Sequence, residues 1–376
     1  MADRSRSTAA RELLEGYLER TGVTGEGDSA KRYLWTDAFA VQALFGLSHI
    51  FEDKYFQDLA LKLIALVHEH LGSHHPDDLR KDRISGLSEK EAALHPTIAG
   101  LRIGKNLPER REDQSYNSQL EWERDGQYFH YLTRWIQTLL LAHRETNSEE
   151  YAVWALELIL AAERFIYREG DHIGMYWKMD TVLSRPLVAS TGAHDPLEGM
   201  FCAKSIQLAL PERAAELDPL VRKLEELCRG RDWATSDALG IGGLLLNTTR
   251  AAEIIAQNGK LISEVKPQKL LKDSLYSLQI FTPGFHDQQP AGRRLAFREG
   301  GLSLGIRSLN GRKEDLKMLQ PELEQLQKYQ NVARKIEDFW LEPHNREARS
   351  WQEHREINTV TLACSLLAVQ APQVFS

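Results

Sequence analysis

A regular alternation between two kinds of predicted helix constrains this chain more than any other feature. Apolar residues recur every three or four positions along almost the whole sequence, which is the spacing of helices. The first kind of helix has one apolar face and one charged face, and it is predicted at residues 8–21, 55–71, 149–168, 211–229, 262–280 and 314–341. A helix of this kind is expected to have one face in solvent and the other on a core.

The second kind of helix is apolar on more than one face. It is predicted at residues 36–50, 125–142, 195–209, 236–256, 299–308 and 354–370. A helix that is apolar most of the way round packs against neighbours on most sides. The alternation therefore predicts an all-α fold in which a ring of inner helices lies inside a ring of outer helices.

The predicted inner helices share a polar start. Their first residues are Trp35-Thr36-Asp37, Asp125-Gly126-Gln127, His194-Asp195-Pro196, Thr235-Ser236-Asp237, Arg298-Glu299-Gly300 and His354-Arg355-Glu356. These starts form a degenerate internal repeat whose period varies with the preceding loop. Because every inner helix follows an outer one, we expect all the starts at one end of the ring, which we call the mouth.

Three long connections lead into inner helices and are expected to lie over the mouth. Residues 73–124 have little helical periodicity, residues 170–194 are compatible with a β-hairpin, and residues 281–298 are rich in turns. Loops of more than about 15 residues without regular structure tend to be functional.

Composition limits the organisation and the partners. No linker interrupts residues 1–376, so we expect one domain with a long insertion at 73–124. The 47 basic and 54 acidic residues are interspersed, which predicts neither a nucleic-acid nor a membrane partner. The first ten residues lack the apolar core of a secretory signal, so a cytoplasmic protein is expected. The three isolated cysteines are predicted to be buried free thiols, and we expect no metal site.

The inner-helix starts W-x-D at 35–37, D-G-Q-Y at 125–128 and H-D-P-L at 194–197 resemble those of the six-hairpin (α/α)6 toroids. That superfamily includes glycoside hydrolases, unsaturated glucuronyl hydrolases and N-acylglucosamine epimerases. The resemblance implies a carbohydrate-active enzyme that works in the mouth on a small-molecule or oligosaccharide substrate, and we expect no cofactor.

Glycoside hydrolysis is the first predicted activity, and it requires two carboxyl groups at the scissile bond. Asp125 and Asp195 are the candidates, because both are predicted to open inner helices. The resemblance to the unsaturated glucuronyl hydrolases implies catalytic aspartates at such starts, and Asp195 is the closer match. Both residues are equally suited to capping a helix.

Two alternatives stay open. A sugar epimerase or isomerase would use His194 and His354 as its proton-transfer pair, because imidazole exchanges protons near neutral pH. A non-catalytic toroid would bind a carbohydrate or another partner through the mouth.

Other polar and aromatic residues near the mouth are predicted to bind substrate. They are Trp35, Asp37, Tyr128, His130, Trp177, Lys178, Arg185, Trp233, Asp237, Arg298, Glu299 and Glu356. We expect Thr36 and Ser236 to cap their helices, which would leave Asp37 and Asp237 free to face the mouth. The G-I-G-G segment at 240–243 lies within an apolar helix and predicts close helix packing instead of a phosphate loop.

Overall fold

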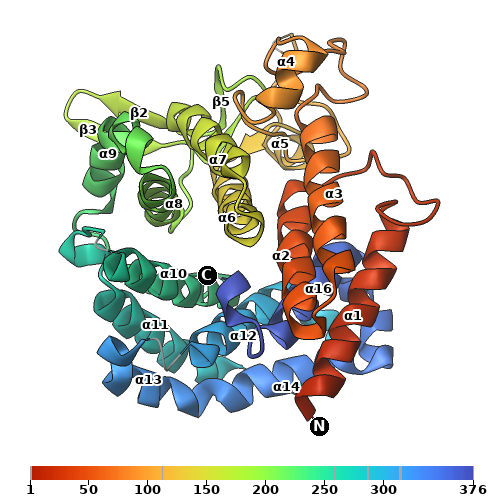
Figure 1. The fold of residues 1–376 in the computed structure, drawn as a ribbon, viewed down its shortest axis with the longest axis vertical. Helices are drawn as coiled ribbons and strands as arrows, with labels where there is room; N and C mark the ends of the chain where they lie inside the picture. Colours follow the sequence, from red (N-terminus) through yellow and green to blue (C-terminus); the bar gives the residue numbers. More distant parts are fainter. Residues whose placement is uncertain (1, 112, 258, 286–287, 313–315, 376) are drawn as a thin grey trace.

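The computed structural model describes residues 2–111, 113–257, 259–285, 288–312 and 316–375, and within these ranges six inner helices form a ring. They are α2 (Leu34–Phe51), α6 (Phe129–Thr146), α8 (Asp195–Ala209), α10 (Ala238–Ala256), α12 (Ala296–Gly311) and α16 (Arg355–Leu367). Each packs against the next, and α16 packs against α2, so the ring is closed (Figure 1).

The outer helices surround this ring. They are α1 (Ala2–Arg20), α3 (Lys54–Leu71), α7 (Glu149–Ala162), α9 (Asp218–Cys228), α11 (Pro267–Phe281), α13 (Gln320–Leu326) and α14 (Gln330–Leu341). In chain order, α3 packs on α2, α7 on α6, α9 on α8, α11 on α10, α14 on α12, and α1 on α16 (Figure 1). The predicted (α/α)6 toroid is confirmed.

Burial separates the two layers as the sequence pattern predicts. Every residue of α2 from Thr36 to Leu47 is buried, whereas α14 buries one stripe that includes Val332, Ile336 and Trp340. Within the described ranges, no helix is both long enough and apolar enough to cross a membrane.

Several predicted helix boundaries were wrong. Helix α6 begins at Phe129 instead of residue 125, because Gln127–Tyr128 form strand β1. The helix predicted at 149–168 ends at Ala162, because residues 166–169 enter a β-hairpin. The helix predicted at 314–341 is divided by a 3-10 turn at Gln327–Tyr329, and residues 314 and 315 lie outside the described part of the chain.

Two small antiparallel sheets lie on the connections that precede α6 and α8. Strands β2 (Ile166–Glu169) and β3 (His172–Met175) form a hairpin that begins four residues before the segment predicted to hold one. Strands β1, β4 (Lys178–Met179) and β5 (Pro186–Val188) form a second sheet in the order β1-β4-β5. The pairing of β1 with β4 therefore joins the two connections.

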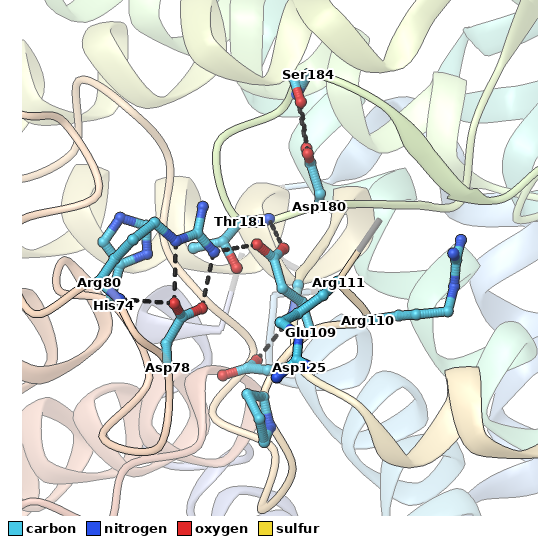
Figure 2. Close-up of polar contacts among 12 residues, drawn as sticks. His74, Asp78, Arg80, Glu109, Arg110, Arg111, Asp125, Asp180, Thr181 and Ser184 are labelled. Atoms are coloured by element: carbon cyan, nitrogen blue, oxygen red, sulfur yellow. Dashed lines mark hydrogen bonds and ion pairs between the residues drawn. The ribbon is translucent and has the colours of Figure 1, made fainter. Parts of the chain in front are cut away.

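The connection at 73–124 is ordered by polar contacts. It contains two short helices, α4 (Glu89–Leu94) and α5 (Ser118–Glu123). Between them the buried carboxylate of Glu109 accepts hydrogen bonds from the Arg80 guanidinium and, at 2.5 Å, from the backbone N–H of Thr181 (Figure 2). The third long connection, 281–298, contains two 3-10 turns, and its residues 286 and 287 lie outside the described ranges.

Close contact between α10 and α12 explains the G-I-G-G segment. A Cβ atom on Gly242 would lie 2.0 Å from the carbonyl oxygen of Gly301, and one on Gly305 would lie 2.5 Å from that of Gly242. The two backbones touch here, so the predicted role in helix packing is confirmed. At Gly243 an added Cβ would meet no atom nearer than 3.9 Å.

We therefore expect Gly242→Ala to destabilise the protein by about 1–3 kcal/mol or more, because the helices must separate to admit the methyl group. Gly243→Ala is the matched control and should stabilise the helix by up to about 1 kcal/mol. Urea unfolding of both variants measures the difference. Equal unfolding midpoints would contradict the close packing of α10 on α12.

Candidate active site

A pocket of about 260 Å³ opens where the inner helices begin. The starts of four inner helices line it, through Trp35 on α2, His130 on α6, Asp195 on α8 and Asp237 at the start of α10. The polar starts of these helices therefore converge at the mouth of the ring.

Asp195 supplies a carboxyl group that is 5% exposed in the first turn of α8. The backbone N–H of Gly192 donates to its Oδ2 atom at 3.0 Å. A Cβ atom on Gly192 would lie 2.3 Å from Oδ1, so this approach requires glycine. Burial raises the pKa of Asp195 to about 7, and the negative charge of Glu198 adds to the rise. This carboxyl group can therefore accept and release a proton near neutral pH, as a general acid or base must.

Arg134 and Glu198 also line the pocket, one turn after His130 and Asp195 on the same two helices. The Arg134 guanidinium is 3% exposed and lies against the rings of Trp35 and Phe39, at 5.4 and 5.1 Å from their centroids. Its Nη2 atom is 3.9 Å from Glu198 Oε1, while Thr133 Oγ1 donates to Glu198 Oε2 at 3.0 Å. Among the described residues, the Nε and Nη1 atoms of Arg134 have no hydrogen-bond partner. Because unpaired buried donors are costly, these atoms are suited to an oxygen of a bound molecule.

His130 contributes a neutral imidazole to the same wall. The indole N–H of Trp177 donates to His130 Nδ1 at 2.9 Å, so the neutral ring carries its hydrogen on Nε2. Burial lowers the pKa of His130 to about 4, which keeps the ring uncharged at pH 7. His130 is therefore a hydrogen-bond donor and not a cation.

His194 is held in one tautomer by a backbone carbonyl. Its Nε2 atom is 2.9 Å from the carbonyl oxygen of Trp233, which can only accept, so Nε2 carries the hydrogen. The basic atom of the neutral ring is then Nδ1. His194 lines the pocket immediately before Asp195.

The structure brings together some of the predicted site residues and leaves the others elsewhere. Those that line the pocket are Trp35, His130, Trp177, His194, Asp195 and Asp237. Those that do not are Asp37, Tyr128, Lys178, Arg185, Trp233, Arg298, Glu299, Glu356, Asp125 and His354.

Asp125 does not reach the pocket because it precedes strand β1 instead of opening α6. It is fully buried, with one oxygen paired to the Arg102 guanidinium and the other accepting from the Gly104 N–H at 3.0 Å. Asp125 thus anchors the connection at 73–124, and the predicted Asp125–Asp195 pair does not form in the pocket.

His354 lies at the exposed start of α16, where its ring meets the edge of Phe297 at a centroid distance of 5.8 Å. The predicted pair of His194 and His354 is therefore not brought together in the pocket.

The acidic residues at other helix starts have structural partners. Asp37 is buried, and it accepts from the Tyr17 hydroxyl at 2.5 Å and from the Tyr33 N–H at 3.1 Å. Glu356 forms an ion pair with Arg20 at 2.9 Å. These contacts occupy carboxylates that were expected to face substrate.

The carboxylates of Glu299 and Asp237 are also engaged by neighbouring side chains and backbone N–H groups. Glu299 binds Arg294 at 2.7 Å and accepts from the Trp340 indole at 2.8 Å. Asp237 caps α10 by accepting from the Gly240 N–H at 2.9 Å, and its other oxygen pairs with Arg298. The expectation that Ser236 would cap in place of Asp237 was wrong.

The remaining predicted residues support the connections around the mouth. Lys178 is fully buried and donates to backbone carbonyl oxygens, including that of Arg124 at 2.6 Å. Arg185 donates to a carbonyl oxygen of the 73–124 connection. Trp233 is buried with its indole bonded to a carbonyl oxygen, and buried Tyr128 stacks on His130 at 5.3 Å.

The sequence prediction missed Arg134 and Glu198. Arg134 follows His130 by four residues, and Glu198 follows Asp195 by three. Residues at these spacings share one helix face, so the spacing could have identified both.

The cysteine prediction is confirmed, since Cys202, Cys228 and Cys364 are buried free thiols. Within the described part of the chain, no group of three or more His, Cys, Asp or Glu side chains is arranged to hold a metal ion.

No protein-family model and no curated protein match this sequence. Among solved structures, the fold is similar to that of a cellobiose 2-epimerase from Bacillus thermoamylovorans B4167. The TM-score is 0.45 and the identity 9%, over 80% of this chain and 75% of that chain. The fold is also similar to a sugar epimerase from a ruminal bacterium, with a TM-score of 0.44 and 10% identity over 81% and 76% of the two chains. At these identities the likeness concerns the fold alone.

The raised pKa of Asp195 predicts a pH-dependent effect of Asp195→Asn on stability. Because the carboxyl pKa rises from its ordinary 3.8 to about 7 on folding, ionisation opposes the folded state as the pH increases. Between pH 5 and pH 8 the wild type should lose about 2–3 kcal/mol of stability that the variant keeps. Urea unfolding at both pH values tests this, with Asp58→Asn at an exposed position as the control. If the free energies of unfolding of Asp195→Asn and the wild type differ by the same amount at both pH values, the pKa of Asp195 is not raised to about 7.

Proposed function

We propose that this chain is a sugar isomerase or epimerase that transfers a proton at a carbon next to the substrate carbonyl. The carrying observation is the buried Asp195 carboxyl group, whose pKa near 7 suits a base that removes and returns a proton. Two residues of the same pocket offer N–H groups to a ligand. Arg134 offers its Nε and Nη1 groups, and His130 offers its Nε2 group.

In the proposed reaction, the Asp195 carboxylate takes a proton from the carbon next to the carbonyl group. The electron pair moves onto the carbonyl oxygen, and the resulting enediolate is stabilised by the Arg134 cation and the neutral His130 donor. A carboxylate base combined with a neutral imidazole is an established arrangement for this chemistry. The hydroxyl proton then passes from the oxygen of the deprotonated carbon to the former carbonyl oxygen. Protonated Asp195 returns its proton to the former carbonyl carbon while the other oxygen becomes the new carbonyl oxygen, which converts an aldose to a ketose and regenerates the Asp195 carboxylate.

We favour aldose–ketose isomerisation over epimerisation. In isomerisation the proton moves between adjacent carbons on one face of the enediolate, so a single base suffices, whereas epimerisation delivers the proton to the opposite face. His354 does not line the pocket, so the histidine pair expected for a two-base epimerase is incomplete. His194 Nδ1 is the available partner if a second proton-transfer group is used.

Aromatic side chains support a sugar as the substrate. Trp35 and Trp177 line the pocket and are each partly exposed, so part of each ring can contact the apolar face of a sugar ring. Asp237 also lines the pocket, although its two carboxylate oxygens already accept from the Gly240 N–H and from Arg298. The convergence of these groups with Asp195 and His130 also argues against the non-catalytic alternative.

Glycoside hydrolysis is the second candidate, and one observation favours it. Asp195 and Glu198 place two carboxyl groups in one pocket, and the pKa near 7 would let Asp195 act as the acid. This pair replaces the Asp125–Asp195 pair expected from the sequence.

Incubation with a panel of aldoses and ketoses in heavy water separates the two candidates. For the isomerase we expect interconversion of aldose and ketose with solvent deuterium at carbon, followed by NMR. Asp195→Asn should lower kcat by about 10²- to 10⁴-fold, whereas the exposed control Asp58→Asn should not. Cleavage of disaccharides without deuterium at carbon would instead establish the hydrolase.

The pH dependence of turnover gives an independent test. Because Asp195 must be ionised to act as the base, kcat/KM should rise with pH and level off above about 7. A profile that falls through this range would mean that the protonated carboxyl group is the active form, as the hydrolase predicts.

A further inference from the structure

A second pocket of about 290 Å³ lies at the opposite end of the ring from the mouth. It is formed between the later turns of α6, α8 and α10, and it shares no lining residue with the mouth pocket. Its apolar wall includes Leu140, Phe201, Leu208 and Ile254. The proposed reaction uses none of these residues.

Arg250 is the buried cation of this second pocket. Its side chain lies on α10 and is 4% exposed, and its Nη1 atom donates to Asn247 Oδ1 at 2.7 Å. In the described part of the chain, its Nε and Nη2 atoms have no hydrogen-bond partner. These two N–H groups lie along one edge of the guanidinium, where they match the two oxygens of a carboxylate or phosphate.

The charges around Arg250 leave it available for an anion. Glu253 lines the pocket, but its carboxylate is paired with Arg312. Burial, and then the charge of Arg134, lower the pKa of Arg250 to about 10, so it remains a cation at neutral pH. Arg144 adds a second positive side chain at the exposed edge of the pocket.

A polar acceptor lines the same pocket as the cation. Gln137 is 6% exposed and lines the pocket, and its Oε1 atom has no partner among the residues that the structure describes. An acceptor and a forked donor in one pocket suit a ligand that carries both a hydroxyl group and an anionic group.

We infer that this second pocket binds a small organic oxyanion, with its carboxylate or phosphate on the Nε and Nη2 atoms of Arg250 and its apolar body against Leu140 and Leu208. Both kinds of oxyanion present two oxygens to the same fork. The volume exceeds that of a bare anion, and the apolar wall gives the remainder of the molecule a surface to bury.

Isothermal titration with benzoate, phenyl phosphate and inorganic phosphate tests this inference. We expect benzoate or phenyl phosphate to bind the wild type, and Arg250→Gln to weaken that binding by about tenfold or more, because two charge-assisted hydrogen bonds are lost. The distant and exposed Arg349→Gln is the matched control and should bind as the wild type does. Whichever organic probe binds more tightly identifies the anionic group.

Two further variants make the result decisive. Asp195→Asn should bind the probes as the wild type does, because the mouth pocket is separate. Ser205→Trp keeps Arg250 but fills the second pocket from α8, so it should abolish binding even if Arg250→Gln fails to fold. The inference is overturned if no organic probe binds the wild type at 10 mM, roughly the weakest affinity expected of a fragment of this size. It is also overturned if Ser205→Trp binds normally, or if inorganic phosphate binds as tightly as the organic probes.

Discussion

Because each inner helix is enclosed by two inner neighbours and one outer helix, its side chains can reach solvent only near its two ends. Van der Waals contact closes the ring most tightly where α10 meets α12, at Gly242 and Gly301. A polar group placed along an inner helix must therefore find a partner inside the ring or lie at a pocket. Both pockets described above lie at the ends of inner helices, as this constraint requires.

The same enclosure explains the chemistry of the mouth. Burial raises the pKa of Asp195 and lowers that of His130, so one group is a base near pH 7 and the other is a neutral donor. The Arg134 cation lies against the rings of Trp35 and Phe39, and its distance to the Glu198 carboxylate is 3.9 Å, longer than a hydrogen bond. A solvated surface would remove each of these properties, because water would stabilise the charged forms and satisfy the free N–H groups.

Charge is distributed along the inside of the ring and not confined to the mouth. Arg134 lines one pocket and Arg250 lines the other, and the positive charge of Arg134 helps to lower the pKa of Arg250. Burying two guanidinium groups with unpaired N–H donors costs free energy. Binding of oxygen-bearing ligands at the two ends would recover part of that cost.

The sequence by itself determined the ring, since helical periodicity identified the inner and outer helices, and it determined that polar starts gather at one end. It also predicted that Asp195 and His130 lie at the mouth, where both line the pocket, because both lie in the first turn of an inner helix. The tertiary structure alone decided which polar starts face the pocket. Asp125 is paired with Arg102 across a connection that lacks periodicity, and Glu356 is paired with Arg20 from the other end of the chain. Such partners are set by packing between distant segments, which local spacing does not encode.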